Sequence, residues 1–412
     1  MKKTIAVIAT RDTKQAEQDL AASFIAAKGM NALRIDISTR LGDYDRADVS
    51  SLDVLKAAGY TFADFARKKS KADAVEMMQR SLQVLLLRMY QDGAIHGVLA
   101  LGGVQNAMIC TSAMQLLPIG VPKMLISSVT SGYRPFAPFV GASDIVLVPS
   151  IADIVGINPL TEMMILNASM AIVGMTEHSG TPFKPNVPLV GATIMGATTD
   201  GIEQAIKQIE SHGYHVVTFH STGVGGTAME NLINDDQIVA CMDLCLHEIV
   251  AQDVIGKGFS VGAENRLSAA VKKEIPLVLS PAGLDFIDLF WHEFQNKVIG
   301  DPDRRQYTFH NNDIVHVKLK PNEASKAAKL VVNRLKDYKG RGVMVIPNKG
   351  LRSETFPGEK LYAPEIDQII FDILKNELNP NIKVVELDAH ISDPVFSKTV
   401  SDEMLKLLRE TI

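Results

Sequence analysis

Short, continuous apolar runs alternate along this chain with longer segments that carry apolar residues at helical spacing. Thr4–Thr10, Val98–Leu101 and Met124–Ile126 are runs of this kind, and they are typical of parallel strands that are buried on both faces. Gln15–Lys28 and Asp73–Tyr90 are amphipathic and long enough for helices. A repeated order of strand, helix and strand predicts an α/β fold with a mainly parallel sheet.

The same order begins again after His178–Pro188, a segment rich in proline and glycine that marks a boundary. An apolar run over Leu189–Met195 is followed by a polar turn, a helical pattern over Ile202–Ser211 and a second apolar run over Tyr214–Phe219. This restart predicts two related α/β domains, each of them Rossmann-like and doubly wound.

The length of 412 residues agrees with two or three domains, and we place the domains at residues 1–182 and 183–412. The net charge of −5 and the lack of a long Lys/Arg run argue weakly against a nucleic-acid partner. The sequence contains no uninterrupted apolar stretch of about 18 residues, so we expect no membrane-spanning helix. The first apolar run meets Arg11 too soon for a signal peptide, so we expect a cytoplasmic protein.

Three cysteines, Cys110, Cys241 and Cys245, are a sparse and odd number that fits a reducing compartment. The last two lie four residues apart in a segment that we interpret as helical, Ile238–His247. Buried core thiols explain this pair better than a metal site, because His247 would lie off their face of the helix. We therefore predict no metal site built from protein side chains alone.

Small and polar residues follow the apolar runs in the first predicted domain, where the carboxyl ends of parallel strands bind ligands. Gly102 and Gly103 follow one run and allow a ligand to approach the backbone closely. A helix expected from about Asn106 would direct its N-terminus at the same place, which favours an anion. Asp36, near the end of the second strand, suits either ribose hydroxyls or a helix cap.

The second predicted domain contains a glycine-rich loop, Gly223-Val-Gly225-Gly226, between a strand and a helix. This setting predicts an anion-binding loop, with Thr222 beside it. His220 and Glu230 are the titratable groups nearest the loop. His220 suits either a general base or a strand-end histidine bonded to backbone.

Further polar clusters recur near strand ends, and they favour a cleft if they converge on one sheet edge. Arg266 suits a carboxylate or phosphate. The candidate acid–base groups of the second domain are His220, Glu230, Asp285, His310 and Lys349.

Several of these motifs together resemble one family, the two-domain Tm-one-like proteins, which are similar to the ATP-binding inhibitor domain of a plant tobamovirus-resistance protein. The matching segments are Ala9–Lys14, Leu101–Gly103, Ser127–Gly132, Gly141–Asp144, Ile151–Asn158, Thr222–Glu230, Arg266–Leu267, Leu284–Asp285, His310–Asn311 and His390–Pro394. They span nearly the whole chain.

The resemblance implies ATP or a related nucleotide with Mg²⁺ in the first domain, and association into a homodimer. The resemblance implies a nucleotide site built from Asp12, Thr13, Lys14, Ser128, Thr130, Asp144 and Asn158. The strand ends add the other predicted cofactor-binding residues of this domain, which are Asp36, Gly102, Gly103, Gln105, Asn106, Ser127 and Ser131. Lys14 suits a phosphate, and the hydroxyl-rich turn can supply hydrogen-bond donors. The family usually continues Gly-Gly with Ser-Gly-Gly-Thr, whereas here Val-Gln-Asn-Ala follows Gly103.

Three functions remain open on the sequence. The first is a nucleotide-binding protein that acts on or senses a small anionic metabolite in a cleft between the domains. The second is a metabolic enzyme that performs acid–base chemistry on a sugar acid or phosphate without ATP. The third is a non-catalytic protein-interaction module, which is how the plant relative acts. No Gly-x-x-x-x-Gly-Lys-Ser/Thr motif supports a P-loop ATPase.

Overall fold

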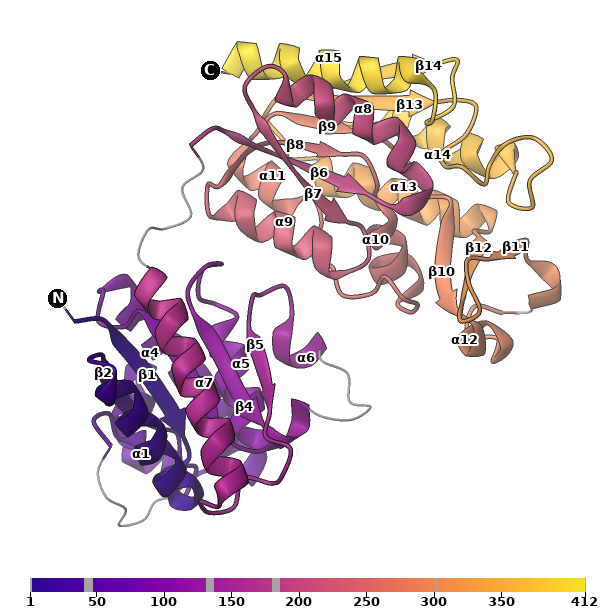
Figure 1. The fold of residues 1–412 in the computed structure, drawn as a ribbon. Helices are drawn as coiled ribbons and strands as arrows, with labels where there is room; N and C mark the ends of the chain where they lie inside the picture. Colours follow the sequence, from indigo (N-terminus) through magenta and orange to yellow (C-terminus); the bar gives the residue numbers. More distant parts are fainter. Residues whose placement is uncertain (1, 41–46, 131–136, 180–185, 301, 412) are drawn as a thin grey trace. The chain divides into compact units, whose positions relative to one another are not determined.

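The computed structural model describes residues 2–40, 47–130, 137–179, 186–300 and 302–411. The chain forms two compact units, Met1–Lys184 and Pro185–Ile412, which are described separately below (Figure 1). The predicted boundary between residues 182 and 183 lies outside the described residues.

The N-terminal unit alternates strands and helices. Its elements are β1 (Thr4–Ala9), α1 (Arg11–Ala27), β2 (Asn31–Asp36), α2 (Ser51–Ala57), α3 (Phe62–Ala66), α4 (Lys71–Gln91), β3 (Gly97–Leu101), α5 (Val104–Met114), β4 (Lys123–Ser127), a 3₁₀ turn (Ser128–Thr130), α6 (Ala137–Val140), β5 (Val146–Pro149) and α7 (Pro159–His178). The five strands form one parallel sheet in the order β2-β1-β3-β4-β5.

Helices cover both faces of this sheet, as the continuous apolar runs predicted. Ala6, Ile8 and Val98 point to the face that packs against α2, α4 and α5. The alternate positions Ile5 and Val7 point to the opposite face, where α1 and α7 pack. Alternate side chains of the central strands therefore pack into two separate cores, and β3 and β4 are buried at every position.

The first loop differs from the sequence-based expectation. The helical pattern was predicted from Gln15 onwards, but α1 begins four residues earlier, at Arg11. Lys14 interrupts this first turn with non-helical backbone angles, φ −134° and ψ 26°. The helix ends as expected, since Gly29 follows the last turn with a φ of +82°.

The C-terminal unit has the same alternation with an inserted antiparallel sheet. Its elements are β6 (Leu189–Ile194), a 3₁₀ turn (Gly196–Thr198), α8 (Thr199–Glu210), β7 (His215–His220), α9 (Val224–Asn234), β8 (Ile238–Asp243), α10 (His247–Ile249), a π-helical segment (Val250–Ile255), α11 (Ser268–Lys273), β9 (Leu277–Leu279), β10 (Phe286–Phe290), α12 (Trp291–Gln295), a 3₁₀ turn (Pro302–Arg304), β11 (Tyr307–Phe309), β12 (Ile314–Lys318), α13 (Pro321–Leu335), β13 (Gly342–Pro347), α14 (Pro364–Glu377), β14 (Ile382–Leu387) and α15 (Pro394–Thr411).

Six strands of this unit form a parallel sheet in the order β14-β13-β9-β8-β6-β7. A separate antiparallel sheet has the order β10-β12-β11. Both units are therefore parallel-sheet α/β domains, which confirms the predicted fold class. No helix in the described ranges is long and apolar enough to cross a membrane.

The segment around the cysteine pair is a strand rather than the expected helix. Cys241 lies in β8, and Cys245 follows the end of that strand. The run Ile238–Asp243 pairs with strands on both sides, and burial on both faces gives it the same apolar character as a buried helix. Both thiols are buried, as expected.

Candidate functional site

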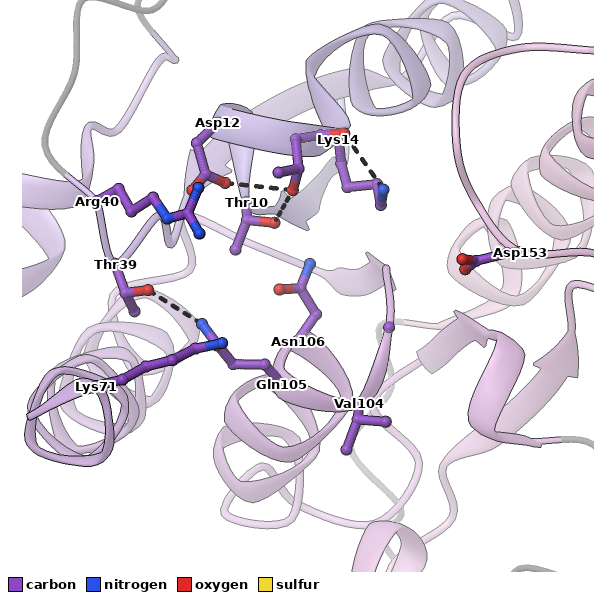
Figure 2. Close-up of a pocket in the computed structure, with 12 residues that line it drawn as sticks. Thr10, Asp12, Lys14, Thr39, Arg40, Lys71, Val104, Gln105, Asn106 and Asp153 are labelled. Carbon is purple, nitrogen blue, oxygen red and sulfur yellow. Dashed lines mark hydrogen bonds between the residues drawn. The ribbon is translucent and has the colours of Figure 1, made fainter.

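A polar cavity of about 300 Å³ lies in the N-terminal unit, at the carboxyl ends of β1 and β3 (Figure 2). It is lined by Thr10, Asp12, Thr13, Lys14, Thr39, Arg40, Lys71, Gly103, Val104, Gln105, Asn106 and Asp153. Six of the predicted cofactor-binding residues are among them, namely Asp12, Thr13, Lys14, Gly103, Gln105 and Asn106. The rest of the lining was not predicted.

The first turn of α5 forms one wall of this cavity. Gly103 is the N-cap residue and provides no side-chain cap, and no described residue accepts a hydrogen bond from the amides of Val104 or Gln105. Gly102 has a φ of +148°, and a Cβ there would lie 2.2 Å from the Nδ2 atom of Asn106. Glycine is therefore required at this turn, and the turn directs unoccupied amide donors into the cavity.

Cationic side chains outnumber carboxylates in the lining. Lys14, Arg40 and Lys71 face the space that also contains Asp12 and Asp153 (Figure 2). The kink in the first turn of α1 places Lys14 on the cavity wall, where its Nζ atom contacts only the Thr13 carbonyl at 3.3 Å among the described partners. The cavity suits an anion that carries more than one negative charge.

The other predicted residues of this unit that the structure describes are not in the lining of this cavity. Asp36 is buried, and its Oδ1 atom accepts hydrogen bonds from the Arg11 amide at 3.0 Å and from Ser38. Asp36 therefore caps the start of α1, which is one of the roles that the sequence predicted for it. Asn158 caps α7 by accepting from the Leu160 and Thr161 amides.

The remaining predicted residues have structural partners too. Asp144 pairs with the buried Lys123 at 2.6 Å, at the opposite, amino-terminal end of β4. Ser127 is buried and accepts from the Val129 amide, and Thr130 donates to the Ser127 carbonyl. Ser128 lies in the same 3₁₀ turn, and Ser131 lies outside the described residues.

In the C-terminal unit, the glycine-rich loop binds an anion that belongs to the protein. The Oε1 atom of Glu248 accepts hydrogen bonds from the amides of Gly223 at 2.7 Å and Gly226 at 3.0 Å. Its Oε2 atom accepts from the Nε atom of Arg266 at 2.7 Å, and Arg266 also pairs with Asp243. The predicted anion preference of the loop is thus met by a buried carboxylate.

The glycines of this loop are needed for close packing. A Cβ at Gly225 would lie 2.1 Å from the carbonyl oxygen of His220, and one at Gly226 would lie 1.9 Å from the Oε2 atom of Glu248. A side chain at Gly225 would therefore collide with the end of β7.

Three of the five candidate acid–base groups form hydrogen bonds or ion pairs with other residues of the protein. Glu230 accepts from the amides of Leu267 at 2.5 Å and Ala269 at 2.6 Å, where it caps α11. Asp285 is buried and pairs with Lys318 at 2.8 Å. Lys349 is exposed and pairs with Asp388. The other two candidates, His220 and His310, line a cavity.

That cavity has a volume of about 520 Å³ and lies within the C-terminal unit. It is lined by Met195, Gly196, His220, Thr222, Phe259, Asp288, His310, Asn311, Ile314, His316, Ser353 and Glu354. The parallel sheet contributes the ends of β6 and β7, while β10 and β12 contribute one face of the antiparallel sheet. Thr222, predicted as part of the anion loop, is also in this lining.

His316 and Glu354 form a paired acid–base group on the cavity wall. The Nδ1 atom of His316 lies 3.3 and 3.2 Å from the two carboxylate oxygens of Glu354. Burial lowers the pKa of His316 below its ordinary value, although the hydrogen bond with Glu354 opposes this effect. Burial alone would raise the pKa of Glu354, but the hydrogen bond with His316 and the charge of Arg352 hold it below its usual value.

Asp288 lies directly across the antiparallel sheet from His316. Its carboxylate is held on both sides, because Ser260 donates to Oδ2 at 2.5 Å and the Nε2 atom of His247 lies 3.0 Å from Oδ1. Burial alone would raise the pKa of Asp288, but the close contact with His247 and the hydrogen bond from Ser260 hold it below its ordinary value. Asp288 is therefore a fixed negative charge beside the His316 ring.

Sequence reasoning missed His316, Asp288 and Glu354. A signal was present for the first two, since Ile314-Val-His-Val-Lys318 and Phe286-Ile-Asp-Leu-Phe290 place one polar residue at the centre of an alternating apolar strand. Glu354 lies in an irregular segment after β13, and no local pattern marks it. In the N-terminal unit, Arg40 and Lys71 were missed for the same reason.

Comparison with known proteins places the chain in a family. Residues 3–181 match the family model described as "Uncharacterised protein family (UPF0261) N-terminal domain", and residues 187–408 match the one described as its C-terminal domain. A UPF0261 protein of Clostridium tetani is 30% identical over 411 residues, which cover 100% of both chains. A UPF0261 protein of Mesorhizobium japonicum is 28% identical and covers 97% of this chain and 98% of its own.

The tomato (Solanum lycopersicum) protein named ToMV resistance protein Tm-1(GCR237) is 32% identical over 359 residues. The match covers 84% of this chain but only 45% of the tomato protein, so the chain spans less than half of that relative. This similarity agrees with the Tm-one-like resemblance that the motifs implied. Since the two family models cover nearly the whole chain, the protein belongs to the UPF0261 family.

Proposed function

We propose that the protein binds ATP or a related nucleotide, together with Mg²⁺, in the cavity of the N-terminal unit. The observation that carries this proposal is the convergence of the uncapped first turn of α5 with the side chains of Lys14, Arg40 and Lys71. Free amides at a helix N-terminus and several cations in one polar cavity are the features that phosphate groups require.

The dimensions of the cavity agree with this use. Its volume of about 300 Å³ is at the lower end of the range for small-molecule sites. The polar lining therefore suits the phosphates, which carry most of the charge of a nucleotide. The family's Ser-Gly-Gly-Thr is replaced here by Val104-Gln105-Asn106-Ala107, but the amides of a helix start do not depend on the side chains that follow.

The residues present also fit Mg²⁺ that arrives with the phosphates. Asp12 and Asp153 line the cavity, and Mg²⁺ usually binds through one or two carboxylates, substrate phosphates and water. A bound Mg²⁺ would neutralise part of the phosphate charge. Lys14 and Arg40 would meet the remaining charge.

Calorimetric titration of the full chain with ATP and ADP, each with and without Mg²⁺, tests this function. We expect saturable binding with one site per chain, and binding that weakens as salt rises because the cavity is cationic. Inorganic phosphate added first should compete with the nucleotide. Equal heats with and without protein in the cell would reject the proposal.

A non-catalytic interaction role is the alternative that the tomato relative suggests, because its name is that of a resistance protein. Under that alternative, nucleotide binding would be absent. The titration above separates the two, since an interaction surface does not need a phosphate-selective cavity.

A further inference from the structure

We propose that the cavity of the C-terminal unit is a catalytic site in which His316 acts as a general base on a small hydroxylated carbonyl compound. The proposal does not depend on nucleotide binding in the other unit, because every residue that carries it belongs to the C-terminal unit.

The orientation of the His316 ring supports this role. An ionised carboxylate only accepts hydrogen bonds, so the contact with Glu354 places the proton of the neutral ring on Nδ1. The lone pair is then on Nε2, and no described residue forms a hydrogen bond with that atom. The side chain is only 6% exposed, and it lines the cavity. A neutral base directed into a cavity and oriented by a carboxylate is a recurring catalytic arrangement.

The groups around His316 keep the ring neutral and in position. Burial disfavours its charged form, and Arg352 and His310 add positive charge nearby. His310 stacks on the His316 ring with centroids 4.9 Å apart, and Phe286 packs against it edge-on at 5.0 Å. Glu354 and Asp288 face the same ring, and they would stabilise the imidazolium that forms when the base takes a proton.

The lining indicates the kind of substrate. The cavity of about 520 Å³ suits a molecule of sugar size. Thr222, Asn311 and Ser353 offer hydroxyl and amide groups for hydrogen bonds with substrate hydroxyls. No described hydroxyl or thiol forms a hydrogen bond with His316, so the base has no protein nucleophile to activate. The base therefore acts on the substrate itself.

The reaction step balances without a co-reactant. The lone pair of His316 Nε2 takes a proton from the carbon beside the substrate carbonyl, and the C–H electron pair moves into the carbonyl to give an enolate. His220, His310 and Asn311 lie on the same cavity and supply donors for the enolate oxygen. Return of the proton from His316 to the former carbonyl carbon, while the proton of the adjacent substrate hydroxyl moves to the enolate oxygen, completes an isomerisation.

A base of this kind can be tested without its natural substrate, because base-promoted ring opening of 5-nitrobenzisoxazole needs only an accessible general base. The base takes the ring C–H proton, the N–O bond breaks, and a coloured nitrophenolate forms. We expect the full chain to open this probe faster than free imidazole at equal concentration. His316→Gln should lower the rate by about 100-fold, the lower end of the contribution of a positioned general base.

A control and a positioning variant complete the experiment. His292→Gln removes an exposed histidine on α12 that does not line the cavity, and its rate should equal that of the wild type. Glu354→Gln should lower the rate less than His316→Gln and move the midpoint of the pH–rate profile to lower pH, because the carboxylate raises the pKa of His316. Glu354→Asp should restore part of that shift. A wild-type rate no faster than imidazole, or an unchanged rate in His316→Gln protein that is folded by circular dichroism, overturns the proposal.

Discussion

The carboxylate of Glu248 accepts a hydrogen bond from the amide of Gly226 at 3.0 Å. The same oxygen accepts from Gly223, and the opposite oxygen accepts from Arg266. A glycine-rich loop at a helix start has thus become part of the core, with an internal carboxylate where an external anion would bind. A motif that predicts anion binding can therefore be correct about the chemistry and misleading about the ligand.

Replacing Glu248 with Gln should destabilise the C-terminal unit. Arg266 keeps Asp243 as its charged partner in this variant, but the Gln NH₂ group then faces a buried donor, either the Nε atom of Arg266 or the amides of Gly223 and Gly226, at a cost of about 1–3 kcal/mol. Urea denaturation followed by circular dichroism measures the loss. The exposed Glu264→Gln is the matched control, and a midpoint for Glu248→Gln equal to that of the control would refute the structural role.

Replacing Lys14 with Ala should weaken ATP binding by roughly 1.5–3 kcal/mol, the range for loss of a charged hydrogen bond. Lys28→Ala removes the same charge from the far end of the same helix, where the side chain is exposed, and should leave ATP affinity nearly unchanged. Calorimetry on the two variants gives the comparison. If both bind ATP like the wild type, Lys14 does not contact the nucleotide.

Replacing Val104 with Pro tests the amides of the first turn of α5. Val104 is the first residue of this helix and is 51% exposed, and proline is tolerated at that position because the amide is not needed within the helix. The variant should keep its thermal stability and lose about tenfold in ATP affinity, which corresponds to about 1.4 kcal/mol. Val104→Ala keeps the amide and serves as control. Equal affinities of the Pro and Ala variants would show that this amide does not meet phosphate.

Two buried histidines should lower the stability of the C-terminal unit as pH falls below about 6.5, whereas Asp367, whose pKa burial raises to about 6, acts in the opposite direction. Burial lowers the pKa values of His316 and His390 below 6.5, so the unfolded chain takes up protons near that pH before the folded protein does. The stability contributed by these two histidines is present above that pH and is lost as pH falls through the folded pKa values.

His316→Gln removes one of these two groups. The variant should therefore lose less stability than the wild type between about pH 7 and pH 5, a window above the range in which most carboxylates titrate. Urea midpoints at several pH values in this window give the two slopes. Parallel slopes for variant and wild type would contradict the assigned pKa direction, whatever the absolute stability of the variant.

The protein should associate into a homodimer, as the family resemblance implies. The segment before α7 and the helix itself expose large apolar side chains, including Val155 at 70%, Met163 at 47% and Leu166 at 37%. Covering such a surface is favourable in water. Light scattering at micromolar concentration should give twice the chain mass, and Val155→Asp should reduce it. Val84→Asp on α4 is the control, and a monomer mass for the wild type would refute the prediction.

Local patterns in the sequence were sufficient to predict most of the helices and strands and the fold class. Buried strands such as β1 and β3 are short apolar runs, and the helices show their apolar faces at regular spacing. Gly29 and Gly213 both have a positive φ just after a helix. This conformation can be predicted from the sequence alone, because glycine is the usual residue at that position. The errors occurred where two structures share one pattern, as in the buried strand Ile238–Asp243, which was interpreted as a helix.

The candidate sites could be predicted only in part. The sequence placed Lys14 and Gly103 correctly on one cavity, because strand ends of a parallel sheet share an edge and this rule needs no coordinates. It also identified the anion preference of the Gly223–Gly226 loop. It could not determine that Asp36 and Glu230 are used as helix caps, because a cap and a ligand-binding carboxylate have the same local sequence.

Tertiary structure alone decided which polar groups meet. Glu248 reaches Gly226 across 22 residues, and His316 reaches Glu354 across 38. These contacts depend on the strand order and on the register of β10 against β12, which follow from the packing of whole elements. The sequence by itself determined the periodicity, the glycine turns and the two-domain α/β fold, because those are set by neighbours along the chain. The occupant of the glycine-rich loop and the partner of the buried histidine were decided by the fold, because a buried charge takes the partner that packing brings within reach.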